Sequence, residues 1–279
     1  MSTSPHILVL ADPDRDGVQD VLNELQPDLK SRAKTVHVMP AEGDAELPDA
    51  DIAIVIGGDG TVISQSRRLL GRNVPLLGIN CGRLGFLAAF DVESLRRFGD
   101  EVLGSNPPLR QHMVMECTHT SDDDQTHAVV VNDAVITAGP PYGMIELAMC
   151  IGGVDGPQMR GDGLIIASPT GSTGHNLSAG GPIIGPGVDA LVISPLAAQS
   201  LAFRSIVIDA EPGIDVSLTT ANPGTTLVID GQLQRPTKAG DQISIRRHAS
   251  TVPMVIRPDE PFYRILLERM RWAAPPVFR

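Results

Sequence analysis

The sequence predicts an α/β N-terminal domain followed by an all-β C-terminal domain. In the first hundred residues, short apolar segments alternate with amphipathic segments of helical period, as in βαβ units around a parallel sheet. From about Leu109, short alternating runs follow one another, separated by Asp, Gly and Pro, which indicates an antiparallel β domain. We place the domain boundary at Pro107-Pro108. We therefore expect domains at 1–108 and 109–257, and a helical tail at 258–279 that packs back on the N-terminal domain.

The elements of the N-terminal domain follow from apolar periodicity. The run IAIVI at 52–56 is apolar throughout, as expected for a strand covered on both faces. The segment at 16–29 carries Val18, Leu22 and Leu25 at helical spacing. Strands are expected at 6–11, 36–39, 52–56 and 74–79, and helices at 16–29 and 62–70. Ligand-binding loops are then expected at the carboxyl ends of the parallel strands.

The C-terminal domain is predicted from short runs of strand-like residues. Strands are expected at 113–117, 128–131, 145–151, 164–167, 191–193, 205–208, 214–218, 226–229, 242–245 and 251–256. One helix is expected over 259–272, entered through Pro261. Its apolar face comprises Phe262, Ile265, Leu266 and Met270.

Charge and composition exclude several classes of partner. The 279 residues carry a formal net charge of −11, whereas binding to nucleic acid or anionic lipid rests on Lys and Arg. No uninterrupted apolar run approaches the ~18 residues of a membrane span, and residues 1–6 do not resemble a signal peptide. Cys81, Cys117 and Cys150 show no CxxC spacing, which is typical of reduced thiols. We expect a soluble cytoplasmic protein without nucleic-acid or membrane partners.

A glycine-rich segment, GGDGT at 57–61, directly follows the apolar strand at 52–56. Glycines let backbone N–H groups approach an anion, and the N-terminus of a following helix favours phosphate. A carboxylate beside phosphate needs a further role. Asp59 is therefore a candidate for accepting a proton from an attacking hydroxyl or for holding Mg²⁺. The alternative is a plain strand-to-helix turn with Asp59 as the helix cap.

A second glycine-rich stretch comprises RGDG at 160–163, an apolar strand, and SPTGSTGHNLSAGG at 168–181. Its hydroxyls offer a polar ligand many uncharged donors, and its position after a buried strand disfavours the alternative of a plain surface loop. Two smaller signals are NCGRLGF at 80–86 and Asn132-Asp133 within the apolar run 129–136. Asn with Asp can bracket a ribose diol or an adenine edge, or can form an Asx turn at a strand end.

Several motifs of other enzymes are missing from the sequence. It has no GxxxxGK[ST], no GxGxxG after the first strand, no GxSxG and no HExxH. Lysine occurs only at positions 30, 34 and 238, outside the glycine-rich loops. Backbone N–H groups and Mg²⁺ would then neutralise most of the charge on a bound phosphate.

Taken together, these motifs resemble those of the NAD kinase family. The matching segments are GGDGT at 57–61, NxGxLGF at 80–86, Asn-acidic at 132–133, RGDG at 160–163, SPTGST at 168–173, LSAGGPI at 177–183 and DGQ at 230–232. The resemblance implies a two-domain fold with NAD in the cleft between the domains. It also implies ATP-dependent phosphorylation of the adenosine ribose 2′-hydroxyl of NAD, with Asp59 as the proton acceptor.

The resemblance further implies which residues bind the substrates. They are Gly58, Gly60, Thr61, Asn80, Phe86, Asn132, Asp133, Arg160, Asp162, Thr170, Ser172, Thr173, Gly174, His175, Asn176, Leu177, Ser178 and Gln232. Mg²⁺ is expected to accompany ATP, with polyphosphate as an alternative donor, and no residue is assigned as a metal ligand. Members of the family assemble as homodimers or homotetramers, which is the expectation here.

Three positions depart from the family pattern, and one of them is Gly174, which replaces the usual Ala and loosens the turn. Asp133 replaces the usual Glu, and His175 stands where a Tyr ring of larger area packs against the dinucleotide. One alternative function is a regulator that binds NAD or NADP without turnover, and the intact Asp59 counts against it. The other is a lipid kinase of the diacylglycerol or sphingosine type, which shares GGDGT but should lack the SPTGST…LSAGGP block.

Overall fold

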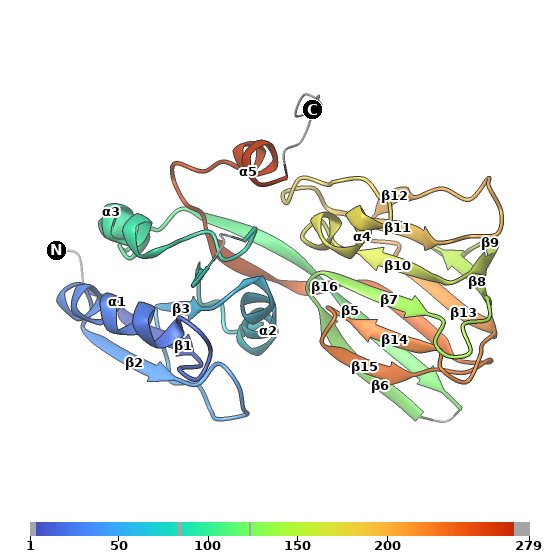
Figure 1. The fold of residues 1–279 in the computed structure, drawn as a ribbon, viewed down its shortest axis with the longest axis horizontal. Coiled ribbons are helices and arrows are strands. Elements are labelled where there is room, and N and C mark those ends of the chain that lie inside the picture. The colour runs from blue at the N-terminus through green and yellow to red at the C-terminus, as the bar shows by residue number, and fades with distance from the viewer. Residues whose placement is uncertain (1–3, 83–84, 123, 271–279) are drawn as a thin grey trace, which may run out of the picture. The chain divides into compact units, whose positions relative to one another are not determined.

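A computed structural model of the chain describes residues 4–82, 85–122 and 124–270, which form two compact units (Figure 1). The first unit comprises the chain up to Gln111 and from Val252 onward, and the second comprises His112–Thr251. Strands β5 (Leu109–Ser121) and β16 (Gln242–Val255) each contribute residues to both units. Within the described ranges, no helix combines the length and apolar character that crossing a membrane requires.

The first unit is built on a parallel sheet with the order β2-β1-β3-β4, and the end of β16 pairs in parallel with β4. Its other strands and its helices are β1 (His6–Ala11), β2 (Thr35–Met39), β3 (Ile52–Ile56), β4 (Leu76–Ile79), α1 (Val18–Arg32), α2 (Asp59–Leu69), α3 (Val92–Val102) and α5 (Phe262–Arg269). Every residue of β3 is buried, and Ile54 shares a core with Leu25 and Leu29 of α1. Burial on both faces explains why the β3 sequence is apolar throughout.

Helices α2 and α3 are among the elements of the first unit that differ from the sequence prediction. Helix α2 begins at Asp59 instead of Val62, so the glycine-rich motif itself supplies its first turn. Helix α3 was not predicted. It begins after Asp91, whose carboxylate accepts from the Ser94 N–H at 2.7 Å, while the Ser94 hydroxyl oxygen accepts from the Asp91 N–H at 2.9 Å. This reciprocal pair is a capping box in which serine replaces the more usual Glu or Gln.

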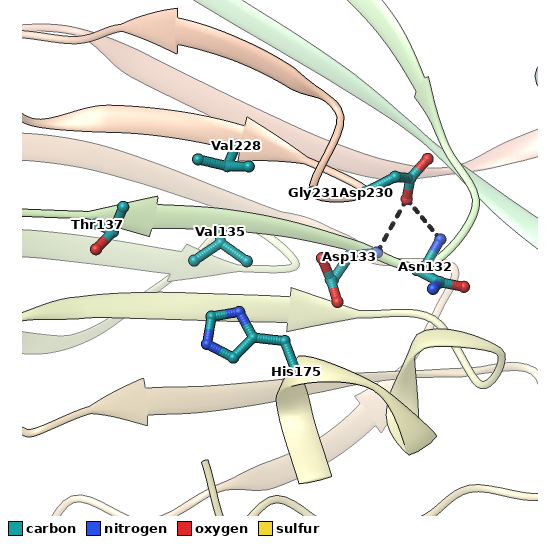
Figure 2. Close-up of a pocket in the computed structure, with 8 residues that line it drawn as sticks. All are labelled: Asn132, Asp133, Val135, Thr137, His175, Val228, Asp230 and Gly231. Atoms are coloured by element: carbon teal, nitrogen blue, oxygen red, sulfur yellow. Dashed lines mark hydrogen bonds between the residues drawn. The ribbon is translucent and has the colours of Figure 1, made fainter. Parts of the chain in front are cut away.

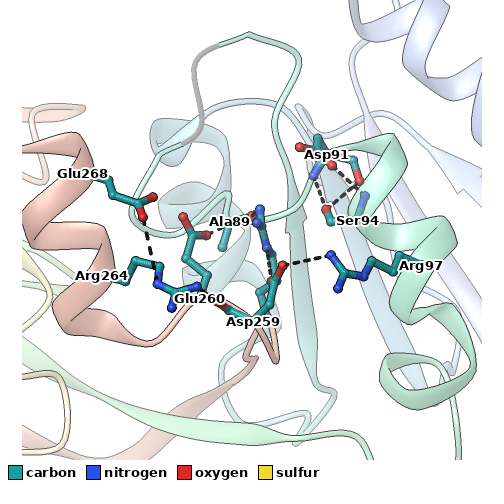
Figure 3. A network of polar contacts seen from close by, with 9 residues as sticks. Ala89, Asp91, Ser94, Arg97, Asp259, Glu260, Arg264 and Glu268 are labelled. Carbon is teal, nitrogen blue, oxygen red and sulfur yellow. Dashed lines mark hydrogen bonds and ion pairs between the residues drawn. The ribbon is translucent and has the colours of Figure 1, made fainter.

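Charged side chains hold the segment before α5 within the first unit (Figure 3). The Arg257 Nε donates to the Asp259 carboxylate at 2.7 Å, and its Nη1 donates to the Ala89 carbonyl at 3.2 Å. Arg97 of α3 lies 3.5 Å from the same Asp259. Helix α5 itself is shorter than the helix predicted over 259–272, of which residues 271 and 272 lie outside the described residues.

The second unit consists of two sheets whose inner faces share one core. The first is antiparallel with the order β12-β11-β10-β7-β14-β15, and the second contains β16, β13, β8 and β9 in that order, with β5 paired to β16 and β6 to β5. Ile136 and Leu164 of the first sheet lie in the same core as Met115 and Val216 of the second. The further elements of the unit are β6 (Asp124–Val130), β7 (Asp133–Thr137), β8 (Ile145–Ile151), β9 (Val154–Gly161), β10 (Gly163–Ala167), η1 (Gly171–Thr173), α4 (His175–Ser178), β11 (Ala190–Leu196), β12 (Ile206–Asp209), β13 (Ile214–Thr220), β14 (Thr226–Ile229) and β15 (Leu233–Pro236).

The predicted order of an α/β domain and a β domain is confirmed, but several strands differ from the prediction. Strands β9 and β15 were not predicted, because their sequences carry little apolar alternation. The two strands predicted over 242–256 form the single strand β16. Conversely, the apolar run 129–136 is divided between β6 and β7, and the break falls at Val131 and Asn132.

Candidate active site

The glycine-rich motif forms a sharp turn between β3 and α2. Gly57 has a φ of 158°, and a Cβ there would meet the Thr61 hydroxyl at 2.6 Å, so the turn requires glycine at this position. Gly58 is the N-cap of α2 and is solvent-exposed. The first turn of α2, which includes Gly60 and Thr61, therefore presents the positive end of the helix dipole at the carboxyl end of β3.

Asp59 lies in this first turn, but its carboxylate does not cap α2. Its Oδ2 accepts from the Phe86 N–H at 2.8 Å, and its Oδ1 accepts from the N–H groups of Leu87 and Ala88 at 3.0 and 2.9 Å. A carboxylate has about four acceptor positions. One position on Oδ2 thus remains for a further donor. A Cβ on Gly85 would overlap the Asp59 carboxylate, so the segment after β4 approaches Asp59 through a glycine.

The segment from Asn80 to Phe86 supplies these contacts within the first unit. Asn80 follows β4 directly, and its side-chain Oδ1 accepts from the Gly82 N–H at 2.6 Å. Phe86 is half-buried and presents its backbone N–H to Asp59. The structure therefore brings Asp59 and Phe86 together, whereas positions 83 and 84 of the motif lie outside the described residues.

In the second unit, Asp230 organises the predicted Asn132-Asp133 pair (Figure 2). Its carboxylate accepts from the backbone N–H groups of Val131, Asn132 and Asp133 at 2.7 to 3.2 Å. The Asp230 carboxylate thus supplies hydrogen-bond acceptors for the backbone N–H groups between β6 and β7. Because these N–H groups are satisfied outside the sheet, the apolar run can be interrupted there. The Asn132 Oδ1 is buried and has no hydrogen-bond partner among the residues that the structure describes.

A cavity of about 300 Å³ lies beside this pair (Figure 2). It is lined by Asn132, Asp133, Val135, Thr137, His175, Val228, Asp230 and Gly231. Burial raises the pKa of Asp133 to about 7, and the neighbouring Asp230 carboxylate acts in the same direction. The cavity thus combines two valine side chains with the carboxyl groups of Asp133 and Asp230, the side-chain amide of Asn132 and an exposed imidazole. A flat heterocycle with polar edges suits such a lining.

The hydroxyl-rich loop 168–181 is fixed mainly by its own buried side chains. Ser172 donates to the Pro169 carbonyl and accepts from the Ile184 N–H at 2.7 and 2.9 Å. Asn176 donates to the carbonyls of Ser172 and Pro182 at 3.0 and 2.9 Å. Both side chains are fully buried and are hydrogen-bonded inside the protein. We therefore assign Ser172 and Asn176 to holding the loop instead of contacting a ligand directly.

The other predicted binding residues of the second unit lie in three places. Thr170 and Thr173 are partly buried in the loop, where the Thr170 hydroxyl lies 3.0 Å from the His112 Nδ1 and the Thr173 hydroxyl donates to the Thr170 carbonyl. Along α4 and just before it lie Gly174, His175, Leu177 and Ser178. The third group comprises Arg160, Asp162 and Gln232. These residues are solvent-exposed in the second unit and do not line the cavity.

Sequence reasoning missed the residues that position the site. Gly85 and Asp230 were not named as site residues, although both lie within recognised motifs. Ser194, whose hydroxyl donates to the Asn176 Oδ1 at 2.7 Å, was not named either. Asp230 could have been found from the Asp-Gly pair that follows an apolar strand, because this pair is typical of a turn. Asp230 has a φ of 52° in that turn. Ser194 lies in the middle of a strand and carries no such local signal.

Comparisons with known proteins give matches to both halves of the chain. The family model of the ATP-NAD kinase N-terminal domain matches residues 15–104, and that of the ATP-NAD kinase C-terminal domain matches residues 131–256. The NAD kinase of Rhodopirellula baltica is 35% identical over 271 residues, which cover 96% of this chain and 87% of that protein. The NAD kinase of Geobacter metallireducens is 36% identical over 229 residues, which cover 81% of each.

The fold is shared with two solved structures. Yeast NADH kinase, complexed with NADH, superposes with a TM-score of 0.83 at 20% identity, covering 98% of this chain and 89% of that chain. An NAD kinase from Archaeoglobus fulgidus, in complex with ATP, superposes with a TM-score of 0.70 at 24% identity. The match covers 91% of this chain and 94% of that chain. The fold and the matches to both halves define a two-domain phosphotransferase that acts on a nucleotide. Within that class, the chain belongs to the NAD kinase family.

Proposed function

We propose that this NAD kinase transfers the γ-phosphate of ATP to the 2′-hydroxyl of the adenosine ribose of NAD, with Asp59 as the proton acceptor. The observation that carries the assignment is the setting of the Asp59 carboxylate. Three backbone N–H groups fix its orientation, and one acceptor position on Oδ2 is left for a hydroxyl proton.

The reaction then needs one bond formed and one broken. The ribose 2′-oxygen attacks the γ-phosphorus, the bond from that phosphorus to the β,γ-bridging oxygen breaks, and ADP leaves. The proton of the 2′-hydroxyl passes to Asp59 during the attack, which makes the oxygen a competent nucleophile. The N-terminus of α2 lies beside this carboxylate and favours the negative charge of the donor phosphates.

We propose that the cavity of the second unit takes part of the dinucleotide. The side-chain amide of Asn132, which lines the cavity, can hydrogen-bond a ribose hydroxyl or a polar edge of the base. Asp133 can donate a hydrogen bond while it is protonated and accept one when it is ionised. His175, on the exposed side of the cavity, supplies a small ring against which a heterocycle can stack.

The donor is proposed to bind as a complex with Mg²⁺. Within the described ranges, no group of three or more His, Cys, Asp or Glu is placed to hold a metal ion. Mg²⁺ commonly binds through substrate phosphates and one or two carboxylates, and its charge neutralises phosphate oxygens. We further propose a homodimer or homotetramer that works in the cytoplasm, with polyphosphate as an alternative donor to be tested.

The decisive experiment is an assay of NADP formation from NAD with ATP and Mg²⁺. The assay is repeated with polyphosphate in place of ATP and with NADH in place of NAD. Formation of NADP at a steady rate is the expected result. Tight binding of NAD without any NADP would instead favour the non-catalytic regulator, and phosphorylation of diacylglycerol or sphingosine would favour the lipid kinase.

A further inference from the structure

Arg15 lies beside the glycine-rich turn, although the sequence motifs do not include it. Strands β1 and β3 are parallel neighbours. Ala11, the last residue of β1, pairs with Ile56, the last residue of β3. The turn after β1 and the turn after β3 therefore start at the same edge of the sheet. Arg15 belongs to the first turn and GGDGT to the second, so both reach the edge where ligands of parallel sheets bind.

The backbone and three side chains fix the position of Arg15. Its N–H donates to the Asp12 carbonyl at 3.0 Å, and its own carbonyl accepts from the Val18 N–H at 3.2 Å. Its Nη1 donates to the Thr61 hydroxyl at 3.4 Å, its Nε lies 3.6 Å from the Asp12 carboxylate, and its Nη2 donates to Glu42. The guanidinium is thus directed at the first turn of α2.

The guanidinium retains capacity for a further anion. It has five N–H donors, and the contacts described above use one N–H group on each of its three nitrogens. One N–H group on Nη1 and one on Nη2 are left for a further acceptor. The Arg15 side chain is 54% exposed, and its partner Glu42 is 73% exposed. A phosphate can therefore reach the guanidinium and compete with Glu42 for Nη2, because two parallel N–H groups match two phosphate oxygens.

We propose that Arg15 binds the phosphates of the nucleoside triphosphate donor and neutralises charge that develops on them during transfer. This inference rests on the proposed function, since it assigns a residue to the donor side of that reaction. It also supplies a fixed positive charge beside the GGDGT turn at 57–61, which itself contains neither lysine nor arginine. Phosphoryl transfer depends on such fixed charges more than on covalent help.

The competing interpretation is purely structural. Arg15 could serve only to tie the segment around Glu42 to the start of α2. The two interpretations predict opposite effects for Glu42→Gln. If Arg15 only ties the segment, losing Glu42 breaks the tie and should change the kinetics in the same direction as losing Arg15. If Arg15 binds phosphate, Glu42→Gln frees the guanidinium and removes a negative charge that repels the donor.

The test compares four variants, Arg15→Gln, Arg15→Lys, Glu42→Gln and Arg96→Gln, in steady-state kinetics with ATP and NAD varied separately. Arg96 is the matched control, an arginine that pairs with Glu24 and Asp28 elsewhere in the first unit. We expect Arg15→Gln to lower kcat/KM for ATP about 10- to 100-fold, with KM for NAD little changed. Arg15→Lys should retain part of the effect, and Glu42→Gln should leave KM for ATP unchanged or lower it.

Two results would overturn the assignment. One is a kcat/KM for ATP in Arg15→Gln that equals that of Arg96→Gln. The other is a rise in KM for ATP in Glu42→Gln as large as that in Arg15→Gln. Calorimetric titration of each protein with ATP and Mg²⁺ reads donor binding without turnover, and thermal unfolding confirms that each variant is folded. If the wild type formed no NADP, a weaker ATP affinity of Arg15→Gln alone would still sustain the role of Arg15.

Discussion

The carboxylate of Asp59 accepts a 2.8 Å hydrogen bond from the backbone N–H of Phe86, which lies 27 positions further along the chain. With the bonds from Leu87 and Ala88, this contact fixes a carboxylate at the N-terminus of a helix without burying it completely. A base held in this way does not need to reorient before it accepts a proton, which is the advantage of a preorganised site.

Asp59→Asn should retain NAD binding and lower kcat by about 10²- to 10⁴-fold, because an amide cannot take the hydroxyl proton. NAD affinity is measured by titration and kcat by NADP formation. The matched control is Asp91→Asn, since Asp91 also accepts backbone N–H bonds in the first unit and Asn is a good helix cap. A near-normal kcat in Asp59→Asn would show that another group accepts the proton.

Gly85→Ala should lower kcat while leaving KM for NAD nearly unchanged. A Cβ at this position overlaps the Asp59 carboxylate, so Asp59 must leave its bonds to the 86–88 turn. Gly82→Ala is the control, because a Cβ there meets only the Asn80 Oδ1, at 3.8 Å. Equal kcat values for the two variants would mean that the orientation of Asp59 does not limit turnover.

Ser194→Ala should destabilise the second unit. The Ser194 hydroxyl donates to the Asn176 Oδ1 at 2.7 Å, and both side chains are fully buried. Removing the donor leaves a buried acceptor unsatisfied, at a cost of about 1–3 kcal/mol in the free energy of unfolding. Urea denaturation measures this loss, with Ser200→Ala at an exposed serine as the control. Unchanged stability would show that the loop has another support for Asn176.

The sequence predicts the strands of the first unit well because burial on both faces leaves apolar runs that periodicity detects. It does not reveal α3, whose start depends on a serine at the third helical position and whose interior holds Gly99. The motifs single out Asp59 and Asn132 as candidate site residues. They do not show what orients these residues, because the Asp59 contacts and the Asp230 bond to Asn132 join segments 27 to 98 positions apart.

Asp133 should make the stability of the protein depend on pH in a direction opposite to that of most carboxylates. Burial raises its pKa from 3.8 to about 7 in the folded state, with Asp230 adding to the effect. Between these two values the folded protein holds a proton that the unfolded chain has released. The folded state then binds more protons than the unfolded state, so the free energy of unfolding falls as pH rises.

Asp133→Asn provides the measurement, because asparagine resembles the neutral acid and does not titrate. The free energy of unfolding of the wild type minus that of Asp133→Asn should fall as pH rises from about 4 to about 7, by at most about 1.4 kcal/mol per pH unit, and level off above that range. Urea denaturation at a series of pH values follows this difference. Asp155→Asn, which alters an exposed carboxylate on β9, is the control for removing a charge. A difference that grows with pH would mean that Asp133 is ionised and stabilised in the folded protein, and the cavity would then present a negative charge to its ligand.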